Sequence, residues 1–364
     1  MSADPTAGAA AAAMRTEASP TRRAVLASGL LAATALLVAG TSGCGLRLDR
    51  DPRLPALSAA DVLRDAVART LAAAEPASEP AVRTGLEAFA AAVGPPWNPP
   101  GDLRTPAPAP NPDPSPLAPL EALAEAVGLI ARTLPDLPSG AAAEASADGD
   151  RERRAAARDA DALAVLADVA AGALLHVRRG DAAAAAALTA EIEDAAAEVL
   201  RSLDSGRSAA EDEEDRAGES TGEDSPAGVL AGLVTAARQA EYAYERAAVH
   251  LGTDSPARAG AAARIASAAS LAAQAGILML PLSPPADRAA WELGTRPHDH
   301  DSALLVLQKA EDGIAAALLT ARAQLPPAAL LHWLTDTAAA RERAGGPQDL
   351  RGAGTGLRHR EEQE

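Results

Sequence analysis

Hydrophobic residues recur along much of this chain at intervals of three and four, the spacing that places side chains on one face of an α-helix. The pattern is clearest in four consecutive segments near the C-terminus, at residues 227–251, 256–278, 301–323 and 327–344. Proline residues suit the ends of these segments, since Pro256 opens the second and Pro326 precedes the fourth. Because most connections are short, neighbouring helices should be antiparallel, and residues 227–344 predict an up-and-down four-helix bundle.

The N-terminal half shows further helical stripes. Ser58 suits the N-cap of a helix whose apolar face carries Val62, Leu63, Val67 and Leu71. Similar patterns predict helices at residues 82–93, 119–134, 151–178 and 181–203. Between residues 94 and 119 proline is too frequent for a helix or strand, so we expect an extended loop. Residues 58–203 therefore predict an N-terminal helical region, and the sequence leaves open whether it forms a second bundle.

Two polar segments carry too little apolar area to fold. Residues 204–226 form an acidic run with no large apolar residue after Leu203, which predicts a disordered linker. The run lacks the glycine and the ligand spacing of an EF-hand loop, so we do not expect it to bind calcium. Residues 345–364 predict a disordered tail.

Composition supports an all-α fold. Of the 364 residues 48% are hydrophobic but only 2% are aromatic, and alanine, the best helix former, makes up roughly a quarter of the chain. Strand-forming residues are scarce, which argues against sandwiches, barrels and doubly wound folds. The 33 basic residues, with Lys309 the single lysine, face 50 acidic ones and leave a net charge of −17. This charge repels nucleic acid, so we exclude nucleic-acid binding.

The N-terminus reads as an export signal. Arg22 and Arg23 form a twin-arginine motif, and an uncharged run then leads to Cys44, the only cysteine. The preceding Thr41, Ser42 and Gly43 are similar to a bacterial lipobox, so residues 1–43 predict a signal peptide and Cys44 a lipidated N-terminus. Residues 44–57 would then be a tether that holds the protein at the outer face of the cytoplasmic membrane.

Other interpretations of this segment stay open. The apolar run could be retained as an uncleaved anchor, or the chain could be secreted with an unused cysteine. Residues 1–13 add nothing to the export signal, so translation could begin at Met14 rather than Met1. Each alternative still places the folded part outside the cytoplasm.

Several stretches together resemble a known family. They are Gly43–Leu48 after the leader, Glu245–His250, Ala303–Leu307 with Glu311, and Leu334–Asp336 with Ala338–Arg341. Over residues 227–344 the chain resembles the ferritin-like domain of unknown function found in exported proteins of high-GC Gram-positive bacteria. The resemblance implies a ferritin-like four-helix bundle. Fold-level analogy alone does not imply iron chemistry.

The bundle interior contains candidate metal ligands. Glu241 and Glu311 lie on the apolar stripes of the first and third helices, and Glu245 and His250 lie close by on the first. Ferritin-like di-iron sites also need a Glu-x-x-His on each of two helices, which this sequence lacks. We therefore favour buried glutamates paired with tyrosine or with arginine, such as Arg264 or Arg341, over an iron or manganese site.

A second candidate is the loop sequence His298, Asp299, His300 and Asp301, which could hold zinc. It lies just before a helix, with Asp301 or Ser302 as the expected cap, so capping and solvation are the favoured roles. We expect His176 to carry partial positive charge at the C-terminus of its helix. Tyr242, Tyr244, Trp291 and Trp333 should mostly pack in the core, and a ligand cleft beside Trp291 and the histidine loop is the alternative.

Catalytic motifs are scarce in the sequence. It contains no Gly-x-Ser-x-Gly nucleophile motif and no lysine-bearing glycine loop for phosphate. We therefore predict a non-enzymatic binding or scaffolding module at the cell envelope, whose partner is an envelope protein or a small ligand. The two alternatives are a ferritin-like metal-dependent or redox enzyme and a small-molecule-binding lipoprotein.

Overall fold

The computed structural model describes residues 56–99, 110–147, 149–210, 225–280 and 282–346. Within these ranges the secondary structure is helical, apart from one isolated bridge between Ala74 and Leu117, and this confirms the all-α prediction. Arg22, Arg23 and Cys44 lie outside the described residues, as do the signal peptide and nearly all of the predicted tether and tail.

The helices of the N-terminal half are α2 (Ala59–Ala72), α3 (Pro80–Val93), α4 (Pro119–Thr133), the 3₁₀-helix η1 (Leu134–Asp136), α5 (Gly140–Ala145), α6 (Asp150–Gly180) and α7 (Ala182–Ala210). Those of the C-terminal half are α8 (Pro226–Ala247), the 3₁₀-helix η2 (Ala248–His250), α9 (Pro256–Leu278), α10 (His300–Thr320) and α11 (Pro327–Arg343). Each predicted helix is present, and α9 has the predicted ends. The short α5 was not predicted, because its six alanine-rich residues show no periodic stripe.

The predicted linker begins too early. Helix α7 continues through the first residues of that segment to Ala210, where Arg207, Ala209 and Ala210 are good helix formers. No proline interrupts the chain until Pro226, which is the first residue of α8. The Ser225 side chain caps α8 by accepting a hydrogen bond from the Gly228 N–H at 3.0 Å. Residues 211–224 of the predicted linker lie outside the described residues.

Two other predicted helix caps can be compared with the structure. Ser58 caps α2 as predicted, since its hydroxyl accepts a hydrogen bond from the Asp61 N–H at 3.1 Å. For α10 the prediction of Asp301 or Ser302 is wrong, because the cap is Asp299. The Asp299 carboxylate accepts from the Ser302 N–H at 2.9 Å, and the Ser302 hydroxyl accepts from the Asp299 N–H at 3.1 Å. This reciprocal capping box starts the helix earlier than expected.

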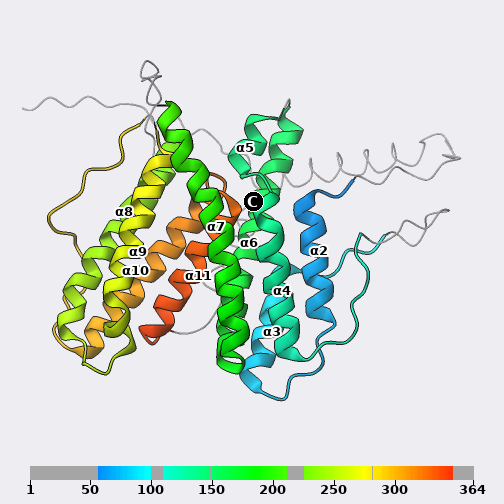
Figure 1. Cartoon of the computed structure of the whole chain (residues 1–364), viewed down its shortest axis with the longest axis horizontal. Helices are drawn as coiled ribbons and strands as arrows, with labels where there is room; N and C mark the ends of the chain where they lie inside the picture. The colour runs from blue at the N-terminus through cyan, green and yellow to red at the C-terminus, as the bar shows by residue number, and fades with distance from the viewer. Residues whose placement is uncertain (1–55, 100–109, 148, 211–224, 281, 347–364) are drawn as a thin grey trace, which may run out of the picture. The chain divides into compact units, whose positions relative to one another are not determined.

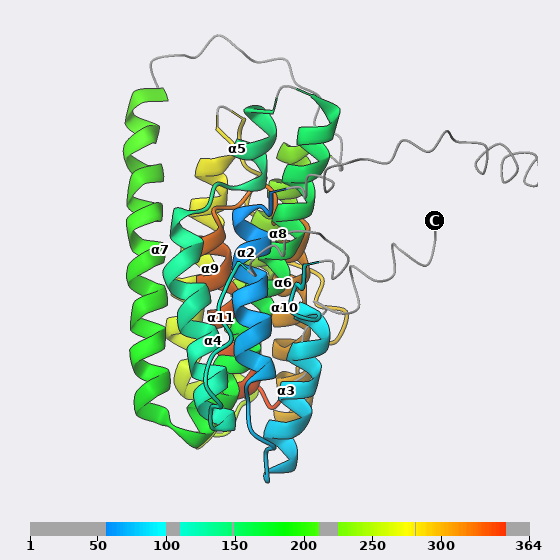
Figure 2. The ribbon, with the colours of Figure 1, turned by 90° about the vertical axis from the view of Figure 1, so that its right-hand side faces the viewer.

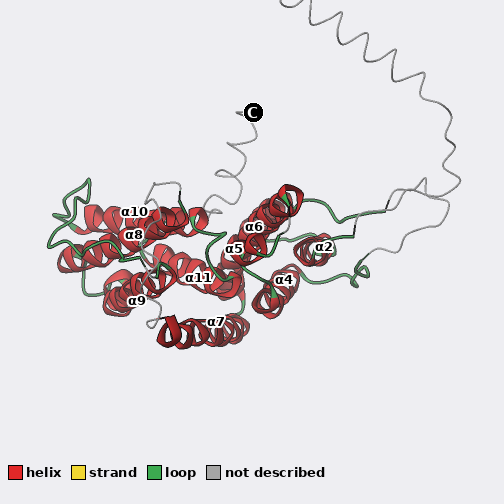
Figure 3. Ribbon diagram, turned by 90° about the horizontal axis from the view of Figure 1, so that it is seen from above, coloured by secondary structure: helices red, strands yellow, loops and turns green. Residues whose placement is uncertain are grey.

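Helices α8 to α11 close into a ring. Helix α8 packs against α9 and α10, and α11 packs against α10 and α9, so each helix has two neighbours within the set. Figure 3, a view from above, shows α8 and α10 side by side, with α9 and α11 beneath them. The connections are short except for the one between α9 and α10, which occupies residues 279–299.

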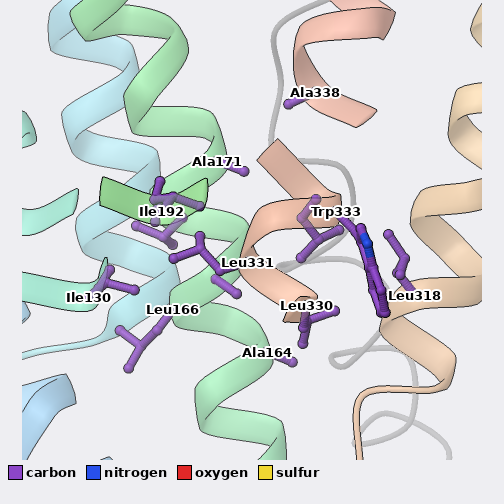
Figure 4. Close-up of a cluster of buried hydrophobic side chains, with 14 of the residues drawn as sticks. Ile130, Ala164, Leu166, Ala171, Ile192, Leu318, Leu330, Leu331, Trp333 and Ala338 are labelled. Atoms are coloured by element: carbon purple, nitrogen blue, oxygen red, sulfur yellow. The ribbon is translucent and has the colours of Figure 1, made fainter. Parts of the chain in front are cut away.

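One hydrophobic core joins the two helical halves. Helix α11 also packs against α6 and α7, and a single buried cluster contains residues from α2 through α11. Figure 4 shows Leu331 of α11 directed toward α6, whereas Trp333 on the same helix lies beside Leu318 of α10. Arg179 of α6 adds an ion pair with Glu342 of α11 at 2.7 Å. In Figure 1, α10 lies on one side of α11, and α7 and α6 lie on the other. Figure 2 shows the protein from the side of α2, α3 and α4.

The proline-rich loop folds back onto α2 through a buried ion pair. Asp65 and Arg69, one turn apart on α2, are almost completely buried and lie 2.9 Å apart. Asp65 accepts hydrogen bonds from the Trp97 N–H at 2.7 Å and from the Asn111 amide at 3.0 Å. Arg69 donates to the Trp97 carbonyl at 2.7 Å and also pairs with Asp113. Apart from Pro119, which is the first residue of α4, the described residues of the predicted loop are non-helical, as predicted. The hydrogen bonds and ion pairs of Asp65 and Arg69 hold this loop against α2.

Gly140 allows α5 to approach the segment after α10. A Cβ at this position would lie 2.7 Å from the Ala160 Cβ and 3.1 Å from the Ala323 Cα, and the neighbouring Ala141 N–H donates to the Ala323 carbonyl at 2.6 Å. Because backbone blocks the extra methyl group, we expect Gly140→Ala to lower the free energy of unfolding by about 1–3 kcal/mol.

Chemical denaturation measures this change. The matched control is Gly232→Ala in α8, where an added Cβ meets no atom within 4 Å. There alanine should stabilise the protein by about 0.5–1 kcal/mol through its helix propensity. Equal effects at the two positions would contradict the predicted close contact.

Two described helices are long and apolar enough to cross a membrane by length and composition alone, α6 and α9. In α6, 83% of the apolar window is buried inside the protein, as in the central helix of a folded core. Helix α9 is less buried at 39%, but it carries the charged Arg264 in its middle. That arginine is paired within the protein, as described next.

Candidate functional site

Glu311 lies at the centre of the ring formed by α8 to α11. Its side chain is completely buried, and both of its carboxylate oxygens are occupied. Arg264 of α9 donates to Oε1 through Nε at 2.8 Å and to Oε2 through Nη2 at 2.7 Å, which is the bidentate geometry of a strong ion pair. The hydroxyl of Tyr244, on α8, donates to Oε1 at 2.8 Å. Glu311 therefore has the arginine and tyrosine partners that its position on an apolar stripe requires.

Arg264 also ties α9 to α11. Its Nη1 pairs with Asp336 at 2.5 Å, and the Ser267 hydroxyl donates to the same carboxylate. Burial opposes the charge on Arg264, but Glu311 outweighs it and raises the pKa of Arg264. Burial raises the pKa of Asp336, but the charge of Arg264, the hydrogen bond from Ser267 and the charges of His332 and Arg343 together outweigh burial and lower that pKa below its ordinary value. Burial and then the negative charge of Glu311 raise the pKa of the Tyr244 hydroxyl. The network therefore joins the carboxylates of Glu311 and Asp336 to one arginine, with a tyrosine that stays neutral.

This interior does not fit the di-metal site of ferritin-like proteins. Such a site needs bridging carboxylates and imidazoles from four helices. Here α9 supplies Arg264 in place of a ligand, and both oxygens of Glu311 accept hydrogen bonds from protein donors. Within the described ranges no group of three or more His, Cys, Asp or Glu side chains is placed to hold a metal ion.

The other candidate ligands on α8 do not reach Glu311. Glu241 is half-buried, and burial followed by the nearby charges of Glu245 and Asp287 raises its pKa. Glu245 is exposed. His250 lies in η2, at a separate cleft. The structure thus separates the four residues that the sequence grouped, and only Glu311 belongs to the buried network.

That cleft has a volume of about 560 Å³. One wall consists of Tyr242, Arg246 and His250 from α8 and η2, and the other is the loop segment 291–298. Trp291 and Tyr242 are half-buried here, so the expectation that they pack in the core is wrong for these two. Tyr244 and Trp333 are buried, as expected. Side chains of α8 and α10 donate hydrogen bonds to the loop and hold it beside Tyr242. These bonds join residues far apart in the sequence, so the local sequence pattern does not predict them.

The histidine-rich loop is divided between different roles. His298 lines the cleft, and its ring lies 3.4 Å from Asp299. Asp299 caps α10, and hydrogen bonds from Ser302 lower the pKa of its carboxyl. His300 accepts a weak hydrogen bond from the Gly252 N–H at 3.4 Å, and Asp301 is exposed in the first turn of α10. The four side chains do not converge on one point.

His176 differs from its predicted role. It is 8% exposed, and its ring meets Phe89 edge-on with the ring centroids 5.6 Å apart. Burial, and then the positive charge of Arg179, lowers its pKa. The expectation of partial positive charge is therefore wrong, because α3 covers this end of α6.

Two polar features went unpredicted. The sequence does contain a pattern from which the Asp65–Arg69 ion pair could have been predicted: two opposite charges one turn apart on the apolar side of a helix. The donors that fix the cleft loop, Arg238 and Gln239 of α8, had no such signal, because their acceptors are carbonyl groups far along the chain.

Comparison with known proteins adds no family assignment, since the chain matches no protein-family model, no curated protein and no solved structure.

Proposed function

We propose that this chain is an exported, lipid-anchored helical protein that binds a small ligand at the cell envelope without catalysing a reaction. One observation carries the proposal: the cleft of about 560 Å³ between α8 and the 291–298 loop, a size typical of small-molecule sites. The twin-arginine motif and Cys44 support a location at the outer face of the cytoplasmic membrane. Scaffolding for an envelope protein is the related role that the sequence also favours.

The ferritin-like assignment for residues 227–344 belongs to the same proposal. Its support is the closed ring of four helices and the single long connection between the second and third of them. The enzyme alternative has less support, because Arg264 and Tyr244 occupy the carboxylate that a metal centre would need. The proposal is therefore a ferritin-like scaffold used for binding.

Metal analysis tests the non-enzymatic part of this proposal. We expect the full chain, purified without a histidine tag and offered iron, manganese and zinc, to retain less than about one-tenth of an equivalent of each, because no set of ligands converges among the residues that the structure describes. Glu311→Gln should leave that content unchanged and lower the stability, because it weakens the ion pair with Arg264.

Glu87→Gln is the control, since that glutamate of α3 is exposed, outside the network and not a candidate ligand. Stoichiometric metal in the parent chain that disappears in Glu311→Gln, but not in Glu87→Gln, would establish the metal-dependent alternative. The full chain is the correct sample, because α11 shares its core with α6 and residues 227–344 would lose that contact.

A further inference from the structure

The loop that connects α9 to α10 forms one wall of the cleft, and side-chain hydrogen bonds from two helices hold it in place. On α8, Arg238 donates to the Pro285 carbonyl at 2.5 Å and Gln239 donates to the Glu292 carbonyl at 2.9 Å. On α10, Lys309 donates to the Thr295 hydroxyl at 3.2 Å. In Figure 1 this connection runs as a gold trace beside α8. A loop of this length that is bonded to two helices is typical of a binding element.

The cleft gathers positive charge in a chain of net charge −17. Arg246 and Arg296 line it, and neither side chain makes a hydrogen bond or ion pair with a residue that the structure describes. By contrast, Arg238 donates a hydrogen bond to the loop and Arg264 forms an ion pair with Glu311, so these two arginines already have partners within the protein. The lining contains a single carboxylate, Glu292, against these two guanidinium groups. Free guanidinium groups at a concave site favour carboxylate and phosphate oxygens.

Aromatic rings stand beside these charges. Trp291 and Tyr242 line the same cleft from the loop and from α8. The Arg288 guanidinium lies 5.0 Å from the centre of the Trp291 ring, and this cation–π contact helps to hold the indole in place. His250 and His298 add two more planar rings. Such rings provide flat apolar surface for a planar ligand.

We infer that the cleft binds a small organic anion that carries a planar ring, with Arg246 and Arg296 holding the anionic group and Trp291 and Tyr242 contacting the ring. This inference rests on the proposed binding function and adds the class of ligand. Carboxylate and phosphate oxygens present the same acceptors to a guanidinium group, so the experiment includes both.

Isothermal titration calorimetry on the full chain tests the inference with five probes. Benzoate and phenyl phosphate carry a ring and an anionic group, inorganic phosphate lacks the ring, benzyl alcohol lacks the charge, and benzylamine reverses it. We expect either benzoate or phenyl phosphate to bind about tenfold or more tightly than benzyl alcohol and benzylamine, and the tighter of the two identifies the anionic group. Inorganic phosphate should bind more weakly than phenyl phosphate.

Variants locate the binding. Arg246→Gln and Arg296→Gln should each weaken the better probe about tenfold, because each removes charge-assisted hydrogen bonds. Both arginines are exposed, and neither side chain makes a hydrogen bond or ion pair with a described residue, so thermal unfolding should stay unchanged. The control Arg83→Gln removes an exposed arginine of α3, remote from the lining, and should leave binding unaltered. Trp291→Ala should weaken phenyl phosphate more than inorganic phosphate.

Four results would overturn the inference: no heat from either ring-bearing anion up to about 10 mM, equal affinity for benzoate and benzyl alcohol, unchanged binding in both arginine variants, or tight binding of benzylamine alone. Each is distinct from failure of the proposed function, whose marker is stoichiometric metal dependent on Glu311. The last of them would reject the anion while keeping the cleft as a ligand site.

Discussion

Replacing Arg264 with leucine is expected to lower the free energy of unfolding by about 3–5 kcal/mol, the usual cost of leaving one member of a buried ion pair without its partner. The variant leaves the Glu311 carboxyl without its cationic partner in an apolar interior, with only the Tyr244 hydroxyl as a donor. It also removes the bond between Arg264 and Asp336, which joins α9 to α11. Urea denaturation followed by far-ultraviolet circular dichroism measures the loss.

The double variant Arg264→Leu with Glu311→Leu distinguishes the cost of an unpaired buried charge from the cost of altered packing. Two apolar side chains of suitable volume remove both charges, so we expect the double variant to recover most of the loss. Arg132→Leu is the matched control, because Arg132 forms an exposed ion pair with Glu125 at 3.3 Å and should cost less than about 1 kcal/mol. A single-variant loss as small as that of Arg132→Leu would contradict the predicted role of Glu311.

The second large effect concerns the proline-rich loop. We expect Asp65→Ala to cost about 3 kcal/mol or more, because it leaves Arg69 buried and removes the acceptor for the Trp97 N–H and the Asn111 amide. The loop should detach from α2, so amide exchange at Trp97 should become much faster. Asp61→Ala on the exposed side of α2 should change neither quantity strongly.

The same variant has a predicted pH signature. Burial opposes ionisation of Asp65, but hydrogen bonds from Asn111, Arg69 and Trp97 outweigh it and hold the pKa of Asp65 below its ordinary value of 3.8. A lowered pKa means that the ionised carboxylate stabilises the folded protein above about pH 4, and this stabilisation is lost as the pH falls through the folded-state pKa. Asp65→Ala should therefore flatten the decline in stability below pH 4. An unchanged acid profile would contradict this role.

The sequence predicted the helices well because their periodicity, prolines and caps are local signals. It also predicted an interior Glu311 and named Arg264 as a partner, since stripe positions on neighbouring helices face a common interior. It offered a cleft beside Trp291 and the histidine loop only as an alternative, because the path of residues 282–299 depends on donors from α8 and α10 that act across long sequence distances. The pairing of Asp65 with Trp97 and Asn111 was hidden for the same reason.

The position of α11 also affects how the protein can fold during synthesis. Among the described helices this one leaves the ribosome last, yet Leu330, Leu331 and Trp333 complete the core that begins with α2. Contacts between such distant parts of a chain form slowly, because a long loop must close first. The apolar faces that α11 covers on the early helices therefore stay unburied until α11 has been synthesised. Loss of α11 through a premature stop codon should leave the whole protein, and not only its C-terminal bundle, exposed to proteases and aggregation.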